Sequence, residues 1–177
     1  MASKIHPFYT SLQSHIQLYP TMSIQLGQPA PDFTLFDSDK NPVQLSAQQG
    51  HNVLLLFFPQ SFTGVCTKEL CSVRDNIALY NQANAKVFGI SVDSVFTLGK
   101  FKEEQQLNFP LLSDFNKKVS ELYGSIYHDW ILDMKGVSKR SAFVIDRKGI
   151  VQYAEVLESA GDIPDFEKIN ATLSELA

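Results

Sequence analysis

The chain has 177 residues, of which 44% are hydrophobic and 19% charged, a composition typical of one globular domain with a sizeable core. A formal net charge of −4 argues against nucleic acid or an anionic membrane as the main partner. No apolar run approaches the roughly 20 residues that span a bilayer. The two cysteines are too few for a disulfide-stapled secreted scaffold, so we expect a reducing, cytoplasmic setting.

Residues 1–21 differ from the rest of the chain. They have no sustained hydrophobic periodicity, and no acidic residue occurs before Asp32. They lack the roughly 7–15-residue apolar core of a signal peptide and the arginines of a transit peptide. We therefore expect an N-terminal extension over residues 1–21, disordered or loosely packed, and one folded domain over residues 22–177.

Short apolar runs between turn residues predict strands, and amphipathic stretches predict helices. In chain order, the pattern predicts a hairpin of 33–36 with 43–45, a helical turn over 46–50, a strand over 53–58, a helix over 64–83, a strand over 87–92, a helix over 94–107, an extended segment over 109–112, a helix over 115–122, an irregular segment over 125–139, a hairpin of 142–145 with 150–155, and a helix over 165–176. Ser46 and Ser94 are expected to cap the helices that they precede. This order indicates an α/β domain with three layers, a mixed central β-sheet and an N-terminal β-hairpin.

Cys66 lies in the first turn of the helix predicted over residues 64–83, soon after the apolar strand 53–58. Apolar residues recur every three or four positions along this helix, at Leu70, Val73, Ile77 and Tyr80. At roughly 100° per residue, Cys66 lies on the centre line of that face, and Cys71 lies about 140° away from Cys66. We therefore expect Cys66 to point inward and Cys71 to point sideways.

A helix N-terminus stabilises an anion, and a thiolate is an anion, so the position of Cys66 suits a reactive thiol. The hydroxyl of Thr63 can accept a hydrogen bond from the thiol or donate one to a bound oxygen. Pro59 ends the strand and is expected to shield the loop from water. In the alternative interpretation, Cys66 is a small buried core residue and Thr63 is only a helix cap.

The spacing of Cys66 and Cys71 limits how the two thiols can react. In an intact helix their Cα atoms are about 8.6 Å apart, whereas a disulfide needs at most about 7 Å. The pair is therefore either two separate thiols or a redox couple linked to local unwinding of the helix. The scattered histidines and the absence of another cysteine pair argue against a metal site.

Pro59, Thr63 and Cys66 form the pattern Pro-x-x-x-Thr-x-x-Cys, and with it the chain resembles the peroxiredoxins. The resemblance runs from residue 27 to the C-terminal helix and includes 109–114 and the strand that follows Arg140. It implies a thioredoxin-like fold without a cofactor or metal. Cys66 corresponds to the peroxidatic cysteine of the family, and Arg140 stands at the position of its active-site arginine.

The resemblance implies a thiol-dependent peroxidase that reduces hydrogen peroxide or organic hydroperoxides. The Cys66 thiolate would attack the peroxide and become a sulfenic acid, while Arg140, Thr63 and the backbone amides at the helix start hold the substrate. Cys71 would then condense with the sulfenic acid, giving an intrachain disulfide. A thioredoxin- or glutaredoxin-like protein would reduce that disulfide. The resemblance also suggests a homodimer.

Several alternatives stay open at this point. The Cys-x4-Cys spacing is similar to the bacterioferritin-comigratory-protein class, whereas the segment 63–67 and the tail resemble the AhpE-type group, often with one catalytic cysteine, in which Cys71 would be structural. A general thiol–disulfide oxidoreductase would normally carry Cys-x-x-Cys, which is absent. A binding domain with two structural thiols is a further alternative. We expect Arg74 to form a surface ion pair with Asp75 or with a neighbouring helix, and Glu69 to lie on the helix surface or brace a loop.

Overall fold

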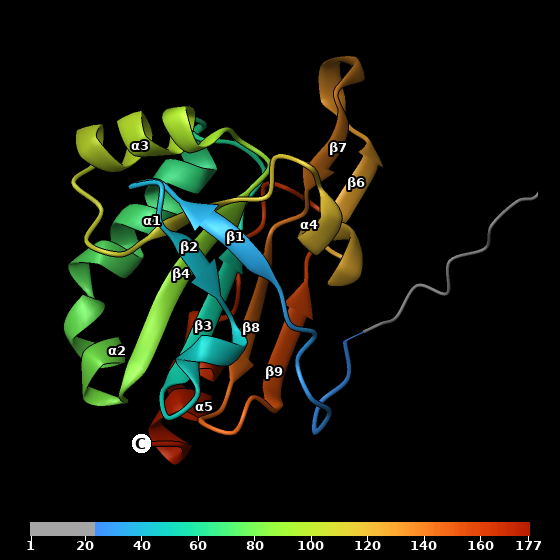
Figure 1. Cartoon of the computed structure of the whole chain (residues 1–177). Coiled ribbons are helices and arrows are strands. Elements are labelled where there is room, and N and C mark those ends of the chain that lie inside the picture. The colour runs from blue at the N-terminus through green and yellow to red at the C-terminus, as the bar shows by residue number, and fades with distance from the viewer. Residues whose placement is uncertain (1–23) are drawn as a thin grey trace, which may run out of the picture.

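The structure is a computed structural model that describes residues 24–177. The extension expected over residues 1–21 lies outside the described residues. At the centre is a seven-stranded sheet with the strand order β2-β1-β5-β4-β3-β8-β9 (Figure 1). Its strands are, in chain order, β1 (Thr34–Asp37), β2 (Pro42–Gln44), β3 (Asn52–Phe57), β4 (Ala85–Ser91), β5 (Leu111–Ser113), β8 (Ser141–Ile145) and β9 (Val151–Val156).

Both strand orientations occur in this sheet. The strands β3, β4 and β5 run parallel to one another, whereas β8 is antiparallel to β3 and β9 is antiparallel to β8. The strands β1 and β2 form the predicted N-terminal hairpin, and β1 joins the sheet antiparallel to β5. The predicted mixed sheet is therefore confirmed.

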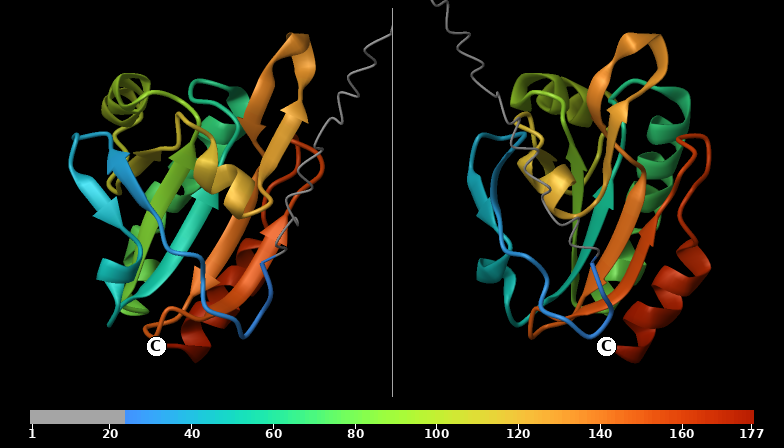
Figure 2. Two further views of the ribbon diagram at one scale, coloured as in Figure 1. Left: turned by 45° about the vertical axis from the view of Figure 1, so that its right-hand side comes forward. Right: turned by 90° about the vertical axis from the view of Figure 1, so that its right-hand side faces the viewer.

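Helices cover both faces of the sheet. The structure describes the helices α1 (Gly64–Asp75), α2 (Ile77–Gln82), α3 (Val95–Glu104), α4 (Lys118–Leu122) and α5 (Phe166–Glu175), and the 3-10 turns η1 (Ser46–Gln48) and η2 (Ile131–Asp133). Figure 2 shows α1 and α5 on one side of the sheet and α4 on the other. The three-layer α/β arrangement is as predicted.

The central strand β3 is buried along its whole length, as its unbroken apolar run predicts. Leu54 and Leu56 belong to the core cluster that includes side chains of α1, α3 and α5. Leu55 and Phe57 belong to the cluster on the opposite face, which includes side chains of α4 and its C-cap. Because β3 is packed on both faces, the loop that leaves its carboxyl end starts from a firmly held position.

The helix predicted over residues 64–83 is interrupted at Asn76. The backbone of Asn76 has φ −106° and ψ 16°, and its side-chain amide donates to the carbonyl of Ser72 at 2.8 Å. Side chains of this kind compete with the helix for backbone hydrogen bonds. The chain therefore forms two helices, α1 and α2, where periodicity alone predicted one.

The two predicted caps have different outcomes. The Ser94 hydroxyl accepts from the Thr97 amide at 3.2 Å, so Ser94 caps α3 as expected. Ser46 does not cap a helix, because its hydroxyl donates to Asp32 at 2.8 Å and the 3-10 turn begins after Leu45. The prediction for Ser46 was wrong because a carboxylate distant in sequence binds the hydroxyl.

The segment 125–139, which we expected to be irregular, forms a hairpin of β6 (Ile126–Asp129) and β7 (Lys135–Ser138). Figure 2 shows that this hairpin projects from the body of the molecule. Its turn contains Leu132 and Asp133, each with φ 56°, in place of the glycine or asparagine that normally signals such a turn. Ile126 is the one buried residue of β6. The segment therefore also lacks the alternation of apolar and polar residues that predicts a strand.

The packing of α3 gives a test of the fold. Leu98 is 0% exposed in the core, whereas Leu79 of α2 is 50% exposed. We expect Leu98→Ala to lower the free energy of unfolding by about 3 kcal/mol, because it leaves a cavity. Leu79→Ala, the same chemical change on a surface helix, should cost less than about 1 kcal/mol. Urea titrations of both variants measure the difference, and equal losses would contradict the packing described here.

Candidate active site

Cys66 lies in the first turn of α1, a few residues after the carboxyl end of β3. The side chain is 1% exposed and lies in the core cluster with Leu70 and Val73, so the prediction that it points inward is confirmed. The first backbone amides of a helix have no partner within the helix and carry partial positive charge. Cys66 is therefore a buried thiol beside several amide donors.

Arg140 lies between β7 and β8 and makes direct contact with the thiol. Its Nη2 donates to Cys66 Sγ at 3.2 Å, although the two residues are 74 positions apart in the sequence. The guanidinium is 1% exposed, and its Nη1 donates to Glu69 in a buried ion pair. Arg140 is therefore not a solvated loop residue, and the structure brings the predicted cysteine and arginine together.

Glu69 is the residue of this site that the sequence analysis placed incorrectly. It is 1% exposed and binds Arg140, whereas we expected a surface or loop-bracing carboxylate. Burial raises the pKa of Glu69 to about 7, although the Arg140 charge acts to lower it. The position of Glu69, three residues after Cys66, was the available signal, since residues three apart share a helix face.

The charge of Arg140 is maintained by its surroundings. Burial alone would lower the pKa of Arg140, but the opposite charges of Glu69 and Cys66 outweigh it and raise the pKa. The guanidinium is thus a permanent cation held against the sulfur. Nη2 of this cation is the atom that contacts the Cys66 sulfur.

Thr63 and Pro59 border the loop that leads into α1. The Thr63 hydroxyl donates to the carbonyl of Gln60 at 2.9 Å. Thr63 occupies the N-cap position, but its side chain makes no capping hydrogen bond, so the helix-cap alternative is wrong. Pro59 is buried.

Cys71 lies away from this centre, as the helical spacing predicted. Its side chain is half-buried, and its Sγ lies 3.7 Å from Gln105 Oε1, at the end of α3. Cys66 and Cys71 are both free thiols within the continuous helix α1. Arg74 pairs with Asp75 at 2.8 Å, as expected, and also donates to the Gln105 carbonyl.

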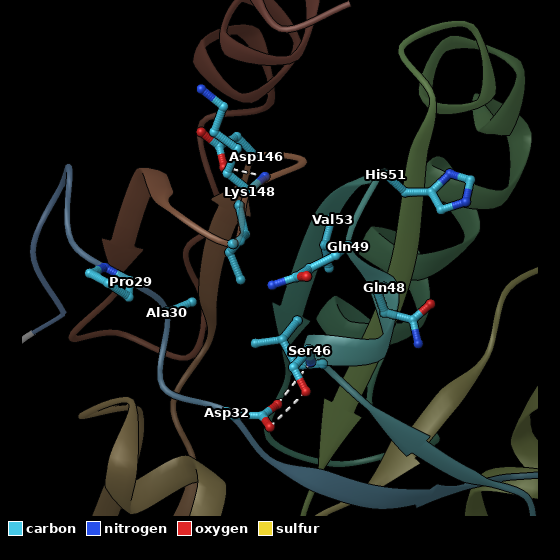
Figure 3. Close-up of a pocket in the computed structure, with 13 residues that line it drawn as sticks. Pro29, Ala30, Asp32, Ser46, Gln48, Gln49, His51, Val53, Asp146 and Lys148 are labelled. Carbon is cyan, nitrogen blue, oxygen red and sulfur yellow. Dashed lines mark hydrogen bonds between the residues drawn. The ribbon is translucent and has the colours of Figure 1, made fainter.

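A surface hollow at the other end of the sheet contains none of these residues. Figure 3 shows that it lies between the N-terminal segment, the start of β3 and the β8–β9 turn. Its two carboxylates are engaged locally, Asp32 with Ser46 and Asp146 with the amides of Lys148 and Ile150. These bonds brace turns of the chain, so Cys66 and its surroundings are the candidate active site and this hollow is not.

Residues 24–177 contain neither a metal-binding cluster nor a membrane-spanning helix. Within that range, histidine, cysteine, aspartate and glutamate side chains form no group of three or more that could hold a metal ion. No helix in the same range is long and apolar enough to cross a membrane.

Comparisons with known proteins agree on one family. The model described as "AhpC/TSA family" matches residues 26–154. Alkyl hydroperoxide reductase E of Mycobacterium tuberculosis is 37% identical over 145 residues, which are 80% of this chain and 91% of that protein. The mitochondrial thioredoxin-dependent peroxide reductase of Drosophila melanogaster is 34% identical over 168 residues, 89% of this chain and 68% of that protein. The crystal structure of peroxidoxin BcpB from Mycobacterium tuberculosis superposes with a TM-score of 0.76 at 32% identity, covering 87% of this chain and 99% of that chain.

The raised pKa of Glu69 predicts a pH dependence of stability. Between the ordinary pKa of 4.5 and about 7, the folded protein retains a proton that the unfolded chain has lost. The contribution of this residue to stability should therefore fall as pH rises through that window, by roughly 3 kcal/mol. In Glu69→Gln this part of the pH dependence should vanish. Urea unfolding of both proteins at pH 5 and pH 7 measures it, and identical pH dependences would contradict the buried carboxyl.

Proposed function

The chain belongs to the AhpC/TSA family, the peroxiredoxins, and is a thiol-dependent peroxide reductase; from this we propose that Cys66 is the cysteine that reduces the peroxide. The observation that carries the proposal is the hydrogen bond from Arg140 Nη2 to Cys66 Sγ at 3.2 Å. A cation in contact with the sulfur, together with the amides of a helix N-terminus, is the environment that makes a cysteine reactive.

In the first step, the Cys66 thiolate attacks one oxygen of the peroxide and the O–O bond breaks. The sulfur is oxidised to a sulfenic acid, and the other oxygen leaves as water or an alcohol after taking up a proton. Negative charge moves from sulfur to the leaving oxygen, so fixed donors around it lower the barrier. The donors in this proposal are Arg140 and the first amides of α1. The Thr63 hydroxyl, whose hydrogen is directed at the Gln60 carbonyl, would accept a hydrogen bond from the peroxide O–H.

Three features support the proposed site. The buried Nε of Arg140 has no hydrogen-bond acceptor within residues 24–177, and a peroxide oxygen would supply one. Glu69 holds the other side of the guanidinium, which limits its rotation. Pro59 is buried beside the loop, where it would restrict the access of water to the thiolate.

In the second step, the Cys71 thiol attacks the sulfenic acid of Cys66, forming an intrachain disulfide and releasing water. An intact α1 keeps the two Cα atoms about 8.6 Å apart, so the first turns must unwind. Cys71 must also leave its contact with Gln105. A thioredoxin- or glutaredoxin-like protein then reduces the disulfide; the name of the Drosophila relative, a thioredoxin-dependent reductase, favours the former.

We assign the catalytic unit to residues 22–177, of which the family model matches 26–154. We also propose that two copies of this chain form a homodimer and that the protein is cytoplasmic. Hydrogen peroxide and organic hydroperoxides are both proposed substrates, since the name of the Mycobacterium tuberculosis relative includes alkyl hydroperoxides.

A one-cysteine mechanism is the second candidate. It is favoured by the contact of Cys71 with Gln105, since this thiol is bound elsewhere in the reduced protein. In that mechanism α1 stays intact, the sulfenic acid persists, and an external thiol reduces it directly.

Serine variants test the assignment of the two cysteines. We expect Cys66→Ser to lower the rate of peroxide turnover by about 1,000-fold or more, because a serine hydroxyl is a much weaker nucleophile than a thiolate at neutral pH. Cys71→Ser should keep a rapid single oxidation and lose turnover with thioredoxin. Stopped-flow fluorescence and a coupled peroxidase assay measure these rates. Full turnover in Cys66→Ser would show that the assignment is wrong.

Thiol counting separates the two mechanisms. After one equivalent of peroxide, the wild type should lose both free thiols and form no covalent dimer, because the disulfide lies within one chain. Cys71→Ser should lose one thiol and yield a sulfenic acid that dimedone traps. Mass spectrometry and a thiol-reactive chromophore provide the counts. A persistent sulfenic acid in the wild type would instead support the one-cysteine mechanism.

A further inference from the structure

The loop between β9 and α5, residues 157–165, reaches the active-site arginine. The amide of Leu157 donates to the Arg140 carbonyl at 2.9 Å, and the carbonyl of Ala160 accepts from Arg140 Nη2 at 3.0 Å. The same Nη2 donates to Cys66 Sγ. A guanidinium Nη carries two hydrogens, so the bond to Ala160 directs one of them and leaves the other for the sulfur.

A group of side chains fastens this loop to the β6–β7 hairpin. The ammonium of Lys139, the residue before Arg140, binds both carboxylate oxygens of Glu158, at 2.7 and 2.8 Å. The Tyr127 hydroxyl donates to the Glu158 carbonyl at 3.0 Å, and the Lys139 ammonium lies 5.5 Å from the centre of the Tyr127 ring. We call Lys139, Glu158 and Tyr127 the loop clamp.

The loop clamp is close to the reacting centre but does not touch it. Lys139 is only 17% exposed, although its partner Glu158 is 84% exposed. Burial raises the pKa of Tyr127, and the negative charge of Glu158 raises it further, whereas the positive charge of Arg140 acts to lower it. The Tyr127 phenol therefore lies within the electrostatic influence of both Glu158 and Arg140. Glu158 is two residues from Ala160, so fixing the one restricts the other.

We propose that Lys139, Glu158 and Tyr127 are positioning residues for the peroxide-reducing step: they hold the loop so that the Ala160 carbonyl turns the Arg140 guanidinium toward Cys66. The inference rests on the proposed roles of Cys66 and Arg140. Without the loop clamp, the Ala160 carbonyl moves and the guanidinium gains rotational freedom, although Glu69 still binds it. The oxidation of Cys66 then becomes slower.

The direction of the effect distinguishes positioning from simple electrostatics. If only the charge near the thiolate mattered, Lys139→Met would slow the oxidation of Cys66 and Glu158→Gln would accelerate it. Positioning requires both variants to be slower. It also requires Cys66 in the double variant to be oxidised no more slowly than in either single variant. The reason is that each of these three variants removes the same Lys139–Glu158 ion pair.

The experiment uses the full chain with Cys71→Ser, so that Cys66 is the only thiol. Hydrogen peroxide oxidation and iodoacetamide alkylation of Cys66 are timed in Lys139→Met, Glu158→Gln, their double variant and Tyr127→Phe. Lys139→Arg retains the ion pair and serves as the conservative variant. Lys135→Met is the matched control, since Lys135 pairs with Asp129 at 3.3 Å in the same hairpin, away from the loop.

We expect the four loop-clamp variants to oxidise about two- to five-fold more slowly, the range that a partly exposed ion pair supports. Lys139→Arg and Lys135→Met should stay within about 1.5-fold of the parent. Thermal melting shows whether each variant is folded at the assay temperature, and Tyr127→Phe removes only a hydroxyl. The inference is overturned if the rates are unchanged, if Glu158→Gln is faster, or if Lys135→Met is equally slow.

Failure of the proposed function gives a different result. Iodoacetamide needs no peroxide, so alkylation reports on the surroundings of Cys66 whatever its catalytic role. If Cys66→Ser still turns over peroxide, the proposed function fails while the alkylation rates still test the loop clamp. If Cys66→Ser is inactive and the loop-clamp variants alkylate and oxidise like the parent, only the further inference fails.

Discussion

The buried guanidinium of Arg140 is the interaction on which the site depends. A charge with 1% exposure is costly unless its partners compensate for lost hydration. Here the partners come from separate parts of the chain: α1 supplies Cys66 and Glu69, and the loop after β9 supplies the carbonyl of Ala160. The same contacts that make the burial tolerable also hold a cation against the sulfur. Stability and reactivity therefore rest on one set of bonds.

The helix α1 imposes a second constraint, because the proposed mechanism gives it two conflicting roles. Its N-terminus presents amide donors to Cys66 and aligns Glu69 with Arg140, which requires the helix to be formed. Disulfide formation with Cys71 requires its first turns to unwind. In the proposed cycle, loss of helical structure breaks the bonds that hold Arg140 at the sulfur. Reduction and refolding would restore them, so catalysis and resolution alternate between two states of one helix.

Residue patterns predicted those elements whose signals are local. The unbroken apolar run of β3, the Ser94 cap and the apolar face that carries Cys66 all follow from periodicity and capping, and the structure confirms them. The predictions that were wrong have physical reasons. The break at Asn76 comes from a side chain that binds its own helix, and the β6–β7 turn adopts positive φ without glycine. Glu69 was misplaced because a carboxylate suggests a surface position unless its buried partner is known.

The sequence by itself determined the α/β class, the inward direction of Cys66 and the separation of Cys66 from Cys71, because helical geometry sets these within a few residues. The motif resemblance pointed to the family. The resemblance also placed Arg140 at the site, but only the tertiary structure showed its contacts: Nη2 binds the Cys66 sulfur, 74 positions away, and the Ala160 carbonyl. Periodicity reports which face of an element is buried but carries no information about what it packs against. The network around the guanidinium is made of contacts between segments distant in sequence, so it exists only once the sheet brings them together.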